Sequence, residues 1–544
     1  MACLGPSGPL QRTLACPLPS PLPPSSFLLP PLTQTPAVFF FFVCLSHFRY
    51  IKHCPSASPA AVSLIAPFAS SASTCLPKCM TMPSRSHIHP HHLLTSDTHA
   101  HLSSVIALPP PPFQFLPRNI RSLLFLALSF RVLPACLQPN LFHMAMSHQP
   151  SEQSSVETKL SRIGRNPDEQ CGFVNCPIYR GSTVLYKTAD DAIKRRCRYW
   201  YGTAGNPTVT NLQKAWTELT GGAGSIVVSS GMQAIAYALL TAANSGDNIL
   251  VADVVYLPTR NLCDNFLLTK GITTTYYDPC ITADGLRELL RQKPNTTVIF
   301  MESPGSQTFE VQDVPSICAV AREFNVTTVI DNTWATPVFF DALGKGCDIS
   351  VEAGTKYVGG HSDMLLGLIS ANEKWYPKLQ SFMNLIQSVP GNEDCYLALR
   401  GLRTMYIRLK EAEKRGLEMA RFMESREEVL HVLHPALPNS RGHEIWKRDF
   451  TGSSGLFSIV LRPNYTLQDV ERMIDSYKLF SIGFSWGGFE SLVMFFDCTT
   501  YRTATTFAPG GILLRFQIGL ESLEDLKQDI CRGFDVLRGK SMCC

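Results

Sequence analysis

Two residues with complementary chemistry, Asp331 and Lys356, stand just past short apolar segments that we predict to be β-strands. Asp331 closes the segment 328–330, and Lys356 follows the segment 348–351 by a few residues. Open α/β sheets bind ligands beyond the carboxyl ends of their strands. A lysine amine can bond to an aldehyde carbon, and a carboxylate can pair with a protonated ring nitrogen. Individually such residues are most often surface charges, but together they predict a site for a pyridine-aldehyde cofactor.

A candidate phosphate cradle lies at residues 229–232, which read Ser-Ser-Gly-Met between a predicted strand at 226–228 and a helical pattern. Glycine allows the backbone to approach an anion closely, and the first N–H groups of a helix are free to bind it. The glycine-rich run 221–224 lacks the Lys-Ser/Thr of a P-loop and precedes a strand. We therefore predict that this run ends a helix and forms a turn.

The elements that must position these residues begin near residue 155, where short β-branched segments alternate with amphipathic helical patterns. This alternation predicts a mainly parallel α/β sheet that is covered on both faces. We expect strands at 226–228, 248–251, 297–300, 328–330 and 348–351, and helices at 232–243 and 314–324.

A second, smaller domain is predicted toward the C-terminus. A long helix is expected to begin near residue 402, because apolar residues recur there at intervals of three and four. The pattern after it is mixed, with strands expected near 455–461 and 512–518. We therefore expect a smaller α+β domain over residues 402–544.

The first 145 residues differ from the rest in composition. Residues 1–150 contain 24 of the 39 prolines, 10 of the 14 histidines and one acidic residue, Asp97. We interpret 1–145 as a disordered, low-complexity extension rich in Pro, Ser and His. Two alternatives are a transit peptide and sequence that lies upstream of a true start at Met144 or Met146.

Composition also excludes several classes of partner. Residues from 151 onward contain 40 basic and 43 acidic side chains, so a basic surface for nucleic acid is not supported. The apolar runs of the extension are far shorter than the ~20 residues that span a bilayer. The body has no Cys-x-x-Cys pairs, and we expect no metal and no membrane association. We expect a cytoplasmic location, or a plastid or mitochondrial one if the extension is a transit peptide.

Several longer strings resemble the Cys/Met-metabolism enzymes that use pyridoxal phosphate (PLP), over residues 160–535. The strings are Glu302-Ser303-Pro304-Gly305-Ser306, Asp331-Asn332-Thr333-Trp334-Ala335, Thr355-Lys356-Tyr357, Gly360-His361-Ser362-Asp363, Arg400-Gly401-Leu402-Arg403, His434-Pro435-Ala436-Leu437-Pro438 and the run from Lys447 to Phe457. The resemblance implies PLP fold-type I, the aminotransferase-like architecture, with a seven-stranded sheet in the large domain. It also implies a homotetramer built as a dimer of dimers.

Domain limits follow from combining the pattern with the resemblance. We expect an N-terminal arm at 146–205 that completes the partner's active site, and a PLP-binding large domain at 206–401. The C-terminal domain then takes 402–544.

The resemblance also implies roles for residues that hold the cofactor. Lys356 resembles the lysine that bonds to PLP and moves protons, and Asp331 resembles the partner of the ring nitrogen. Tyr256 resembles a tyrosine that stacks on the ring and assists proton transfer. The implied phosphate cradle consists of Gly231, Met232 and Thr355, with Tyr201 reaching in from the neighbouring subunit.

The substrate side of the predicted site is carried by Arg515, Ser485 and Trp486. Arg515 resembles the arginine that grips the α-carboxylate of an amino-acid substrate, a task suited to a bidentate guanidinium. Ser485 and Trp486 are expected to line the same pocket. Without the resemblance, Arg515 and Trp486 could equally serve structural pairing and core packing.

One position departs from the family pattern. Many relatives carry an arginine two residues after the tyrosine of the arm, whereas this chain reads Tyr201-Gly202-Thr203. A threonine hydroxyl brings no charge to a phosphate. Alternative sources of charge are Arg195, Arg196 and Arg198.

The family contains β-lyases, γ-lyases and γ-synthases, and the pocket string around Ser485 and Trp486 resembles the β-lyases. The strings 205–208 and 230–232 resemble the γ-acting group instead. Giving most weight to the pocket, we interpret the chain as a β-lyase that acts on cystathionine. A γ-acting enzyme is the first alternative, and a scaffold without catalysis is a remote one.

Overall fold

The computed structural model of the chain describes residues 154–539, and the extension 1–145 therefore lies outside the described residues. A seven-stranded sheet has the order β1-β7-β6-β5-β4-β2-β3. Its neighbours from β3 through β2, β4 and β5 to β6 are parallel, while β7 is antiparallel to β1 and β6. The prediction of a mainly parallel seven-stranded sheet is thus confirmed. The strands are β1 (Gly224–Val228), β2 (Asn248–Ala252), β3 (Thr273–Tyr277), β4 (Thr296–Glu302), β5 (Thr327–Asp331), β6 (Ile349–Ala353) and β7 (Gly367–Ala371).

The five predicted strands correspond to β1, β2, β4, β5 and β6, whereas β3 and β7 were not predicted. Strand β3 reads Thr-Thr-Thr-Tyr-Tyr at the edge of the sheet and buries only its last residue. Strand β7 begins with a glycine, which weakens the strand pattern, although all its residues are buried. Pairing with two neighbours therefore overrides the weak local signal in β7.

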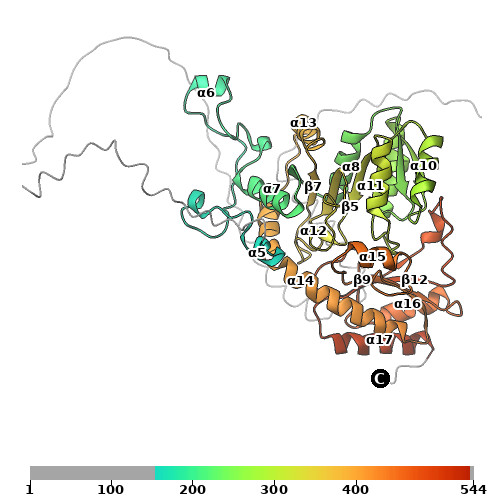
Figure 1. The fold of residues 1–544 in the computed structure, drawn as a ribbon. Coiled ribbons are helices and arrows are strands. Elements are labelled where there is room, and N and C mark those ends of the chain that lie inside the picture. Colours follow the sequence, from blue (N-terminus) through green and yellow to red (C-terminus); the bar gives the residue numbers. More distant parts are fainter. Residues whose placement is uncertain (1–153, 540–544) are drawn as a thin grey trace, which may run out of the picture. The chain divides into compact units, whose positions relative to one another are not determined.

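Helices cover both faces of this sheet, as Figure 1 shows. They are α7 (Pro207–Thr220), α8 (Gly231–Ala242), α9 (Leu257–Asn261), the π-helical turn η3 (Leu262–Leu267), α10 (Ala283–Gln292), α11 (Val314–Glu323), α12 (Thr336–Phe339) and α13 (Tyr376–Ile386). Helix α7 starts at the cap Asn206, whose side chain accepts two backbone N–H groups, and ends at Gly221 with φ +65°. The predicted helix end in the glycine-rich run is thus confirmed.

A five-stranded sheet of order β10-β11-β12-β9-β8 follows in the chain. Its strands β9 and β12 match the two segments predicted near 455–461 and 512–518. Its elements are β8 (Val429–Leu433), α15 (His443–Asp449), β9 (Leu456–Leu461), α16 (Leu467–Ser476), β10 (Ser481–Ile482), β11 (Leu492–Phe496), η4 (Cys498–Thr500), β12 (Leu513–Gln517) and α17 (Leu523–Leu537). Helices α16 and α17 bury Met473 and Phe534 in its core.

The long helix α14 (Asn392–Glu424) connects the two cores, with Leu402 buried in the first and Met419 in the second. It begins at Asn392 rather than near 402, so the predicted start was wrong. Glycine has a low intrinsic helix propensity, and Gly401 weakened the pattern at that point. Packing against the loop at Val358 nevertheless requires glycine at this position of the helix, because a Cβ on Gly401 would lie 2.0 Å from the carbonyl oxygen of Val358.

Helix α14 also holds the loop that follows Lys356. The Arg408 guanidinium donates to the carbonyl oxygens of Tyr357 (2.6 Å), Val358 (3.3 Å) and Gly401 (2.8 Å). The close approach at Gly401 allows these contacts, so the position of Lys356 depends on how tightly α14 packs against its loop.

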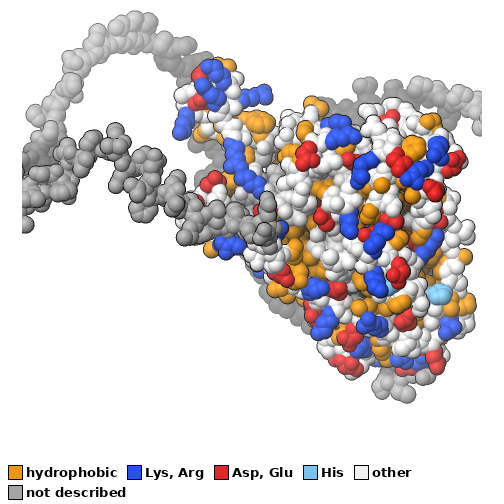
Figure 2. Space-filling model, in the orientation of Figure 1, with side chains coloured by type: hydrophobic (Ala, Val, Ile, Leu, Met, Phe, Trp, Pro, Cys, Tyr) orange, Lys and Arg blue, Asp and Glu red, His pale blue; other side chains and the backbone are white. Residues whose placement is uncertain are grey.

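The N-terminal described segment contains α5 (Val156–Arg162), η1 (Pro167–Gln170), α6 (Ala189–Ile193) and η2 (Gly202–Ala204). In Figure 1 the part around α6 extends away from both sheets. Acidic and basic side chains are intermixed on the face of the molecule that Figure 2 presents. Within residues 154–539 no helix is both long and apolar enough to cross a membrane.

Replacing Gly401 by alanine is expected to lower the free energy of unfolding by about 2 kcal/mol or more, because the new methyl group overlaps the Val358 carbonyl. Chemical denaturation followed by circular dichroism measures this change. The neighbouring exposed residue gives the control, since Arg400→Ala should change stability by no more than about 0.5 kcal/mol. Equal stability of the two variants would contradict the close contact.

Candidate functional site

A cavity of about 440 Å³ lies beyond the carboxyl ends of β4, β5 and β6, and a loop of the smaller sheet contributes one wall. Nine residues that the sequence predicted for the site line this cavity. They are Gly231, Met232, Tyr256, Asp331, Thr355, Lys356, Ser485, Trp486 and Arg515. The fold therefore brings together positions that are spread over 285 residue numbers, from 231 to 515.

Lys356 lies in the loop after β6 and reaches into the cavity. Its Nζ donates a hydrogen bond to Ser485 Oγ at 2.7 Å and lies 5.5 Å from the centre of the Trp486 ring. Burial lowers the pKa of Lys356 to about 8, helped by the positive charge of Arg515 and opposed by Asp331. An amine with this pKa is partly unprotonated near neutral pH, so it can act as a nucleophile or a base.

Asp331 is the last residue of β5, and a threonine fixes its carboxylate. Its Oδ1 accepts the backbone N–H of Thr333 at 3.0 Å and also the Thr333 hydroxyl. That hydroxyl oxygen in turn accepts the N–H of Ala353, which ties β5 to β6. Burial raises the pKa of Asp331, while the Thr333 bonds and Lys356 oppose this. A cationic ring nitrogen would also oppose the effect of burial on this pKa, since it favours the charged carboxylate.

The N-terminus of α8 provides a place for an anion. Ser230 caps this helix by accepting the N–H of Gln233 at 3.2 Å. A Cβ on Gly231 would lie 2.7 Å from the Cβ of Ala353, so only glycine lets the helix start so close to β6. Thr355 stands beside this point, although its hydroxyl is engaged with the backbone of Leu366 at 3.0 and 3.3 Å.

Arg515, on β12, is a buried cation at the other side of the cavity. It donates to the carbonyl oxygen of Ser485 at 3.3 Å and lies 4.6 Å from the Phe496 ring centre. Among the ion pairs of residues 154–539, none joins Arg515 to a carboxylate. Burial lowers the pKa of Arg515 to about 10. An anionic group of a ligand would supply the charge partner that the described protein does not.

Ser485 connects the two cations through its hydroxyl and its carbonyl group. It has φ +86°, a left-handed conformation that is unfavourable for a residue with a side chain. Two residues further on, a Cβ on Gly487 would lie only 3.2 Å from the backbone carbonyl carbon of Lys356, which leaves little room for a side chain. Backbone strain of this kind concentrates at functional sites, where surrounding contacts maintain it.

Tyr256 is positioned by a residue for which the sequence suggested no role. Its backbone N–H donates to Glu302 Oε2 at 2.7 Å, and the residue, which is 42% exposed, lines the cavity. Burial raises the pKa of the Tyr256 hydroxyl, and Arg515 partly opposes this. Burial, together with the nearby Asp331, holds the pKa of Glu302 well above its usual range.

The residues of the cavity fit a phosphorylated pyridine aldehyde. Lys356 supplies an amine of lowered pKa, Asp331 a fixed carboxylate, and the α8 terminus free N–H groups next to a required glycine. These three features lie on different elements but line one cavity.

Tyr201 and Thr203 do not line the cavity of their own chain. Tyr201 is 47% exposed, and Thr203 Oγ1 donates to Gln387 Oε1 at 3.2 Å. Of the alternative cations, Arg196 forms exposed ion pairs with Asp190 and Asp191. The role of Tyr201 in a neighbouring subunit therefore stays a prediction, as does the source of charge that replaces the arginine.

Several cavity residues were not identified from the sequence. They are Gln307, Phe309, Leu365 and Phe496. No periodicity marks them, because each lies in or beside a loop whose path is set by contacts elsewhere. Thr333 could have been found from its place two residues after Asp331, a common spacing for a side chain that caps a turn.

Comparison with known proteins finds a matching family and several named relatives. A family described as Cys/Met metabolism PLP-dependent enzyme matches residues 157–535. A Saccharomyces cerevisiae protein that carries the provisional name cystathionine β-lyase is 55% identical over 333 residues, which cover 61% of this chain and 97% of that protein. Cystathionine β-lyase MetC of Escherichia coli is 38% identical, over 70% of this chain and 98% of that enzyme.

A similar solved structure is the cystathionine γ-synthase of Xanthomonas oryzae pv. oryzae in complex with aminoacrylate and cysteine. It is 27% identical, with a TM-score of 0.65, and the match covers 71% of this chain and all of that chain. The shared architecture therefore extends to a relative with a different name from the β-lyases.

The lowered pKa of Lys356 predicts how its amine responds to pH. In protein freed of cofactor, trinitrobenzenesulfonate should label Lys356 with a midpoint near pH 8, because the reactive unprotonated amine forms as pH rises through that pKa. Peptide mapping by mass spectrometry measures the labelling at this residue. Exposed Lys374 serves as the internal reference within the same digest. A midpoint above pH 10 at Lys356 would show that its surroundings do not lower the pKa of this amine.

Proposed function

This chain belongs to the Cys/Met metabolism PLP-dependent enzymes, and on that premise we propose that it is a cystathionine β-lyase. The reaction is β-elimination of L-cystathionine to homocysteine, pyruvate and ammonia. The observation that carries the proposal is Trp486, which packs edge-on against Tyr357 with ring centres 5.6 Å apart and stands beside the Lys356 amine. This residue belongs to the pocket string that resembles the β-lyases.

The cofactor would be held from several sides at once. Lys356 would bond to it, Asp331 would pair with its ring nitrogen, and Tyr256 would stack on the ring. Its phosphate would bind at Gly231, Met232 and Thr355. When bound, PLP supplies an electron sink for the charge that develops at the substrate Cα.

Proton transfer is assigned to Lys356 and Tyr256. The Lys356 amine, with its pKa of about 8, can accept the proton from the substrate Cα when it is unprotonated. The protonated amine can then donate to the departing sulfur, and the Tyr256 hydroxyl lies in the same cavity for this step. The hydrogen bond that the amine donates to Ser485 Oγ would hold it in the cavity, where the substrate Cα must lie.

Substrate orientation is assigned to Arg515. Its buried guanidinium would bind the α-carboxylate and thereby fix which bond at Cα is aligned for cleavage. Phe496 beside the guanidinium and the Ser485 carbonyl hold the group in place. Trp486 and Ser485 would then line the path of the leaving thiol.

A γ-acting enzyme is the second candidate. It is favoured by the similarity to a solved cystathionine γ-synthase and by the strings 205–208 and 230–232. The keto-acid product distinguishes a β-lyase from a γ-acting enzyme, because β-cleavage of cystathionine releases pyruvate whereas γ-cleavage releases 2-oxobutyrate.

We propose further that the enzyme is a cytoplasmic homotetramer made of two dimers. The arm before α7 exposes large apolar side chains, which isolated monomers rarely do. They are Phe173, Val174, Ile178, Tyr179, Leu185, Ile193, Trp200 and Tyr201. A second copy of the chain would cover these side chains, and Tyr201 would reach the neighbouring cavity. The assigned domains (arm 146–205, PLP-binding domain 206–401, C-terminal domain 402–544) belong to the same proposal.

Purified enzyme supplied with L-cystathionine is expected to release pyruvate, measured with lactate dehydrogenase, and Lys356→Ala should lower the rate at least about 1000-fold, since it removes the proton-transferring amine. The variant should also lose the visible absorption of lysine-bound cofactor. Release of 2-oxobutyrate would overturn the β-lyase proposal in favour of the γ-acting alternative. If the wild type shows no cofactor absorption even after PLP is added, this would favour the alternative of a scaffold without catalysis.

The assembly has its own test. Multi-angle light scattering of the wild type should give four times the mass of one chain. Replacing Trp200 and Tyr201 together by serine should shift the mass downward and weaken PLP binding, because the arm loses apolar contact area. A monomeric wild type with full activity would contradict both the tetramer and the role of the arm.

A further inference from the structure

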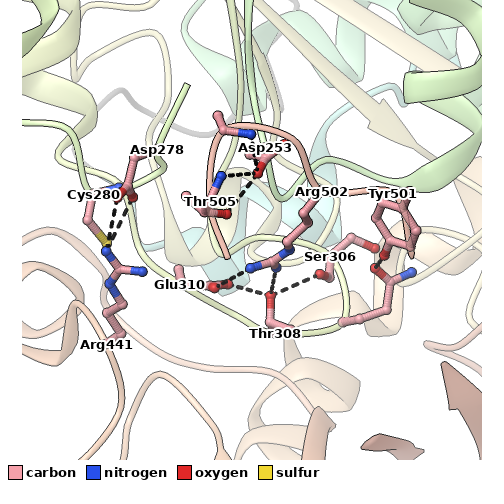
Figure 3. A network of polar contacts seen from close by, with 12 residues as sticks. Asp253, Asp278, Cys280, Ser306, Thr308, Glu310, Arg441, Tyr501, Arg502 and Thr505 are labelled. Carbon is pink, nitrogen blue, oxygen red and sulfur yellow. Dashed lines mark hydrogen bonds and ion pairs between the residues drawn. The ribbon is translucent and has the colours of Figure 1, made fainter. Parts of the chain in front are cut away.

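The loop between β11 and β12 is fastened to the large sheet by a network of polar contacts that the proposed mechanism does not use. We call residues 497–511 the clamp loop. Both strands that it joins carry a cavity residue, Phe496 before it and Arg515 after it. Figure 3 shows the contacts that the clamp loop makes with Asp253, Thr308 and Glu310.

One set of these contacts reaches a segment that forms part of the cavity wall. We call residues 304–310 the wall loop, which lines the cavity with Ser306, Gln307 and Phe309. The Tyr501 hydroxyl donates to Gln307 Oε1 at 3.0 Å. The Arg502 guanidinium donates to Glu310 Oε1 at 2.9 Å and also contacts the Thr308 hydroxyl. Tyr501 and Arg502 thus hold three of the four residues from 307 to 310.

The wall loop needs this support because its backbone is strained. Gln307 has φ +62° and Phe309 has φ +59°, and both are residues with side chains in the left-handed region. Such conformations persist only where surrounding contacts determine them. The ion pair of Arg502 with Glu310 supplies such a contact, and both side chains are buried, with 3% and 6% exposed.

A second set of contacts fastens the clamp loop beside Tyr256. The Asp253 carboxylate accepts the backbone N–H groups of Thr503 (3.1 Å), Ala504 (3.1 Å) and Thr505 (2.8 Å), as well as the Thr505 hydroxyl (2.7 Å). It also pairs with the buried guanidinium of Arg260, in the helix that directly follows Tyr256. Every one of these partners is a donor, so a carboxylate, which only accepts, is the group that satisfies all of them.

We propose that Tyr501 and Arg502 are positioning residues that hold the wall loop in its strained shape and thereby set the affinity for the amino-acid substrate. The cofactor-holding residues Lys356, Asp331 and Gly231 line the same cavity but lie on other segments, in the loop after β6, on β5 and on α8, and the Tyr501 and Arg502 contacts named above do not reach them. Loss of the Tyr501 and Arg502 contacts therefore alters substrate binding and leaves cofactor binding intact. The inference rests on the proposed function for its substrate, cystathionine.

The milder variant, Tyr501→Phe, removes one hydroxyl and keeps the ring. In the holoenzyme we expect it to raise KM for L-cystathionine about three- to ten-fold, with kcat and the visible absorption of the cofactor within about two-fold of the wild type. Arg502→Met should raise KM further and also lower Tm, because it leaves Glu310 buried without its partner. Arg502→Lys, which keeps the charge, should recover part of the loss.

The matched control is Arg441→Met. Arg441 also forms an ion pair with an aspartate, Asp278, which directly follows β3. Arg441 is drawn in Figure 3, but the pair is exposed and forms no hydrogen bond with the wall loop side chains. It should leave KM and Tm unchanged within error. A Tyr501→Phe enzyme with wild-type KM, or with a lower kcat at unchanged KM, overturns the proposal.

A second readout separates this inference from the proposed reaction. L-Norleucine, an unbranched amino acid without a thioether, can be titrated into the holoenzyme and followed through the cofactor absorption. Tyr501→Phe should raise its apparent Kd by the same factor as KM. If the wild type forms 2-oxobutyrate or no keto acid, the β-lyase proposal fails, and this titration still decides whether Tyr501 positions the wall. An unchanged Kd in the variant would overturn the positioning role.

Discussion

Two cations, Lys356 and Arg515, share one cavity, and much of the surrounding structure serves to keep them there. Burial lowers the pKa of both groups, to about 8 and about 10, and the charge of Arg515 adds to the effect on Lys356. A lysine that shifts this far can exchange protons near neutral pH, whereas the guanidinium stays charged. The carboxylate of Asp331 opposes this lowering of the Lys356 pKa, because it favours the charged amine. Ser485 lies between the cations and contacts both of them through different atoms.

The position of these groups depends on close backbone approaches rather than on the groups themselves. Gly401 lets α14 touch the loop after Lys356, and Gly231 lets α8 start against β6. A methyl group at either place would force a helix outward by overlapping its neighbour. Packed interiors accommodate such overlap poorly, so displacement would reach the site. Two glycines far from each other in the chain thus allow the close packing around Lys356 and the anion-binding helix end.

The smaller sheet does more than cover the cavity. It supplies Arg515, the strained Ser485 and the clamp loop. The clamp loop contacts Asp253, three residues before Tyr256, and also the wall loop. Strained residues on both sides of the cavity are held by polar contacts between the two sheets. A rigid wall against which the substrate packs reduces the entropic cost of binding, because fewer side chains and loop residues have to become ordered when the ligand enters.

The sequence by itself determined the fold class, the positions of most strands of the large sheet, and the residues that match a family of PLP-dependent enzymes. It did so because period-two and period-3.6 patterns and short motifs are local, and because Asp331 and Lys356 each follow a recognisable strand. Tertiary structure decided the rest. Strand β7 and the true start of α14 at Asn392 depend on partners elsewhere, and Gly401 lies where α14 packs too closely against Val358 for a side chain. Glu302, Gln307 and the clamp loop could not be found locally, since their importance lies in contacts between segments as far apart as residues 253 and 505.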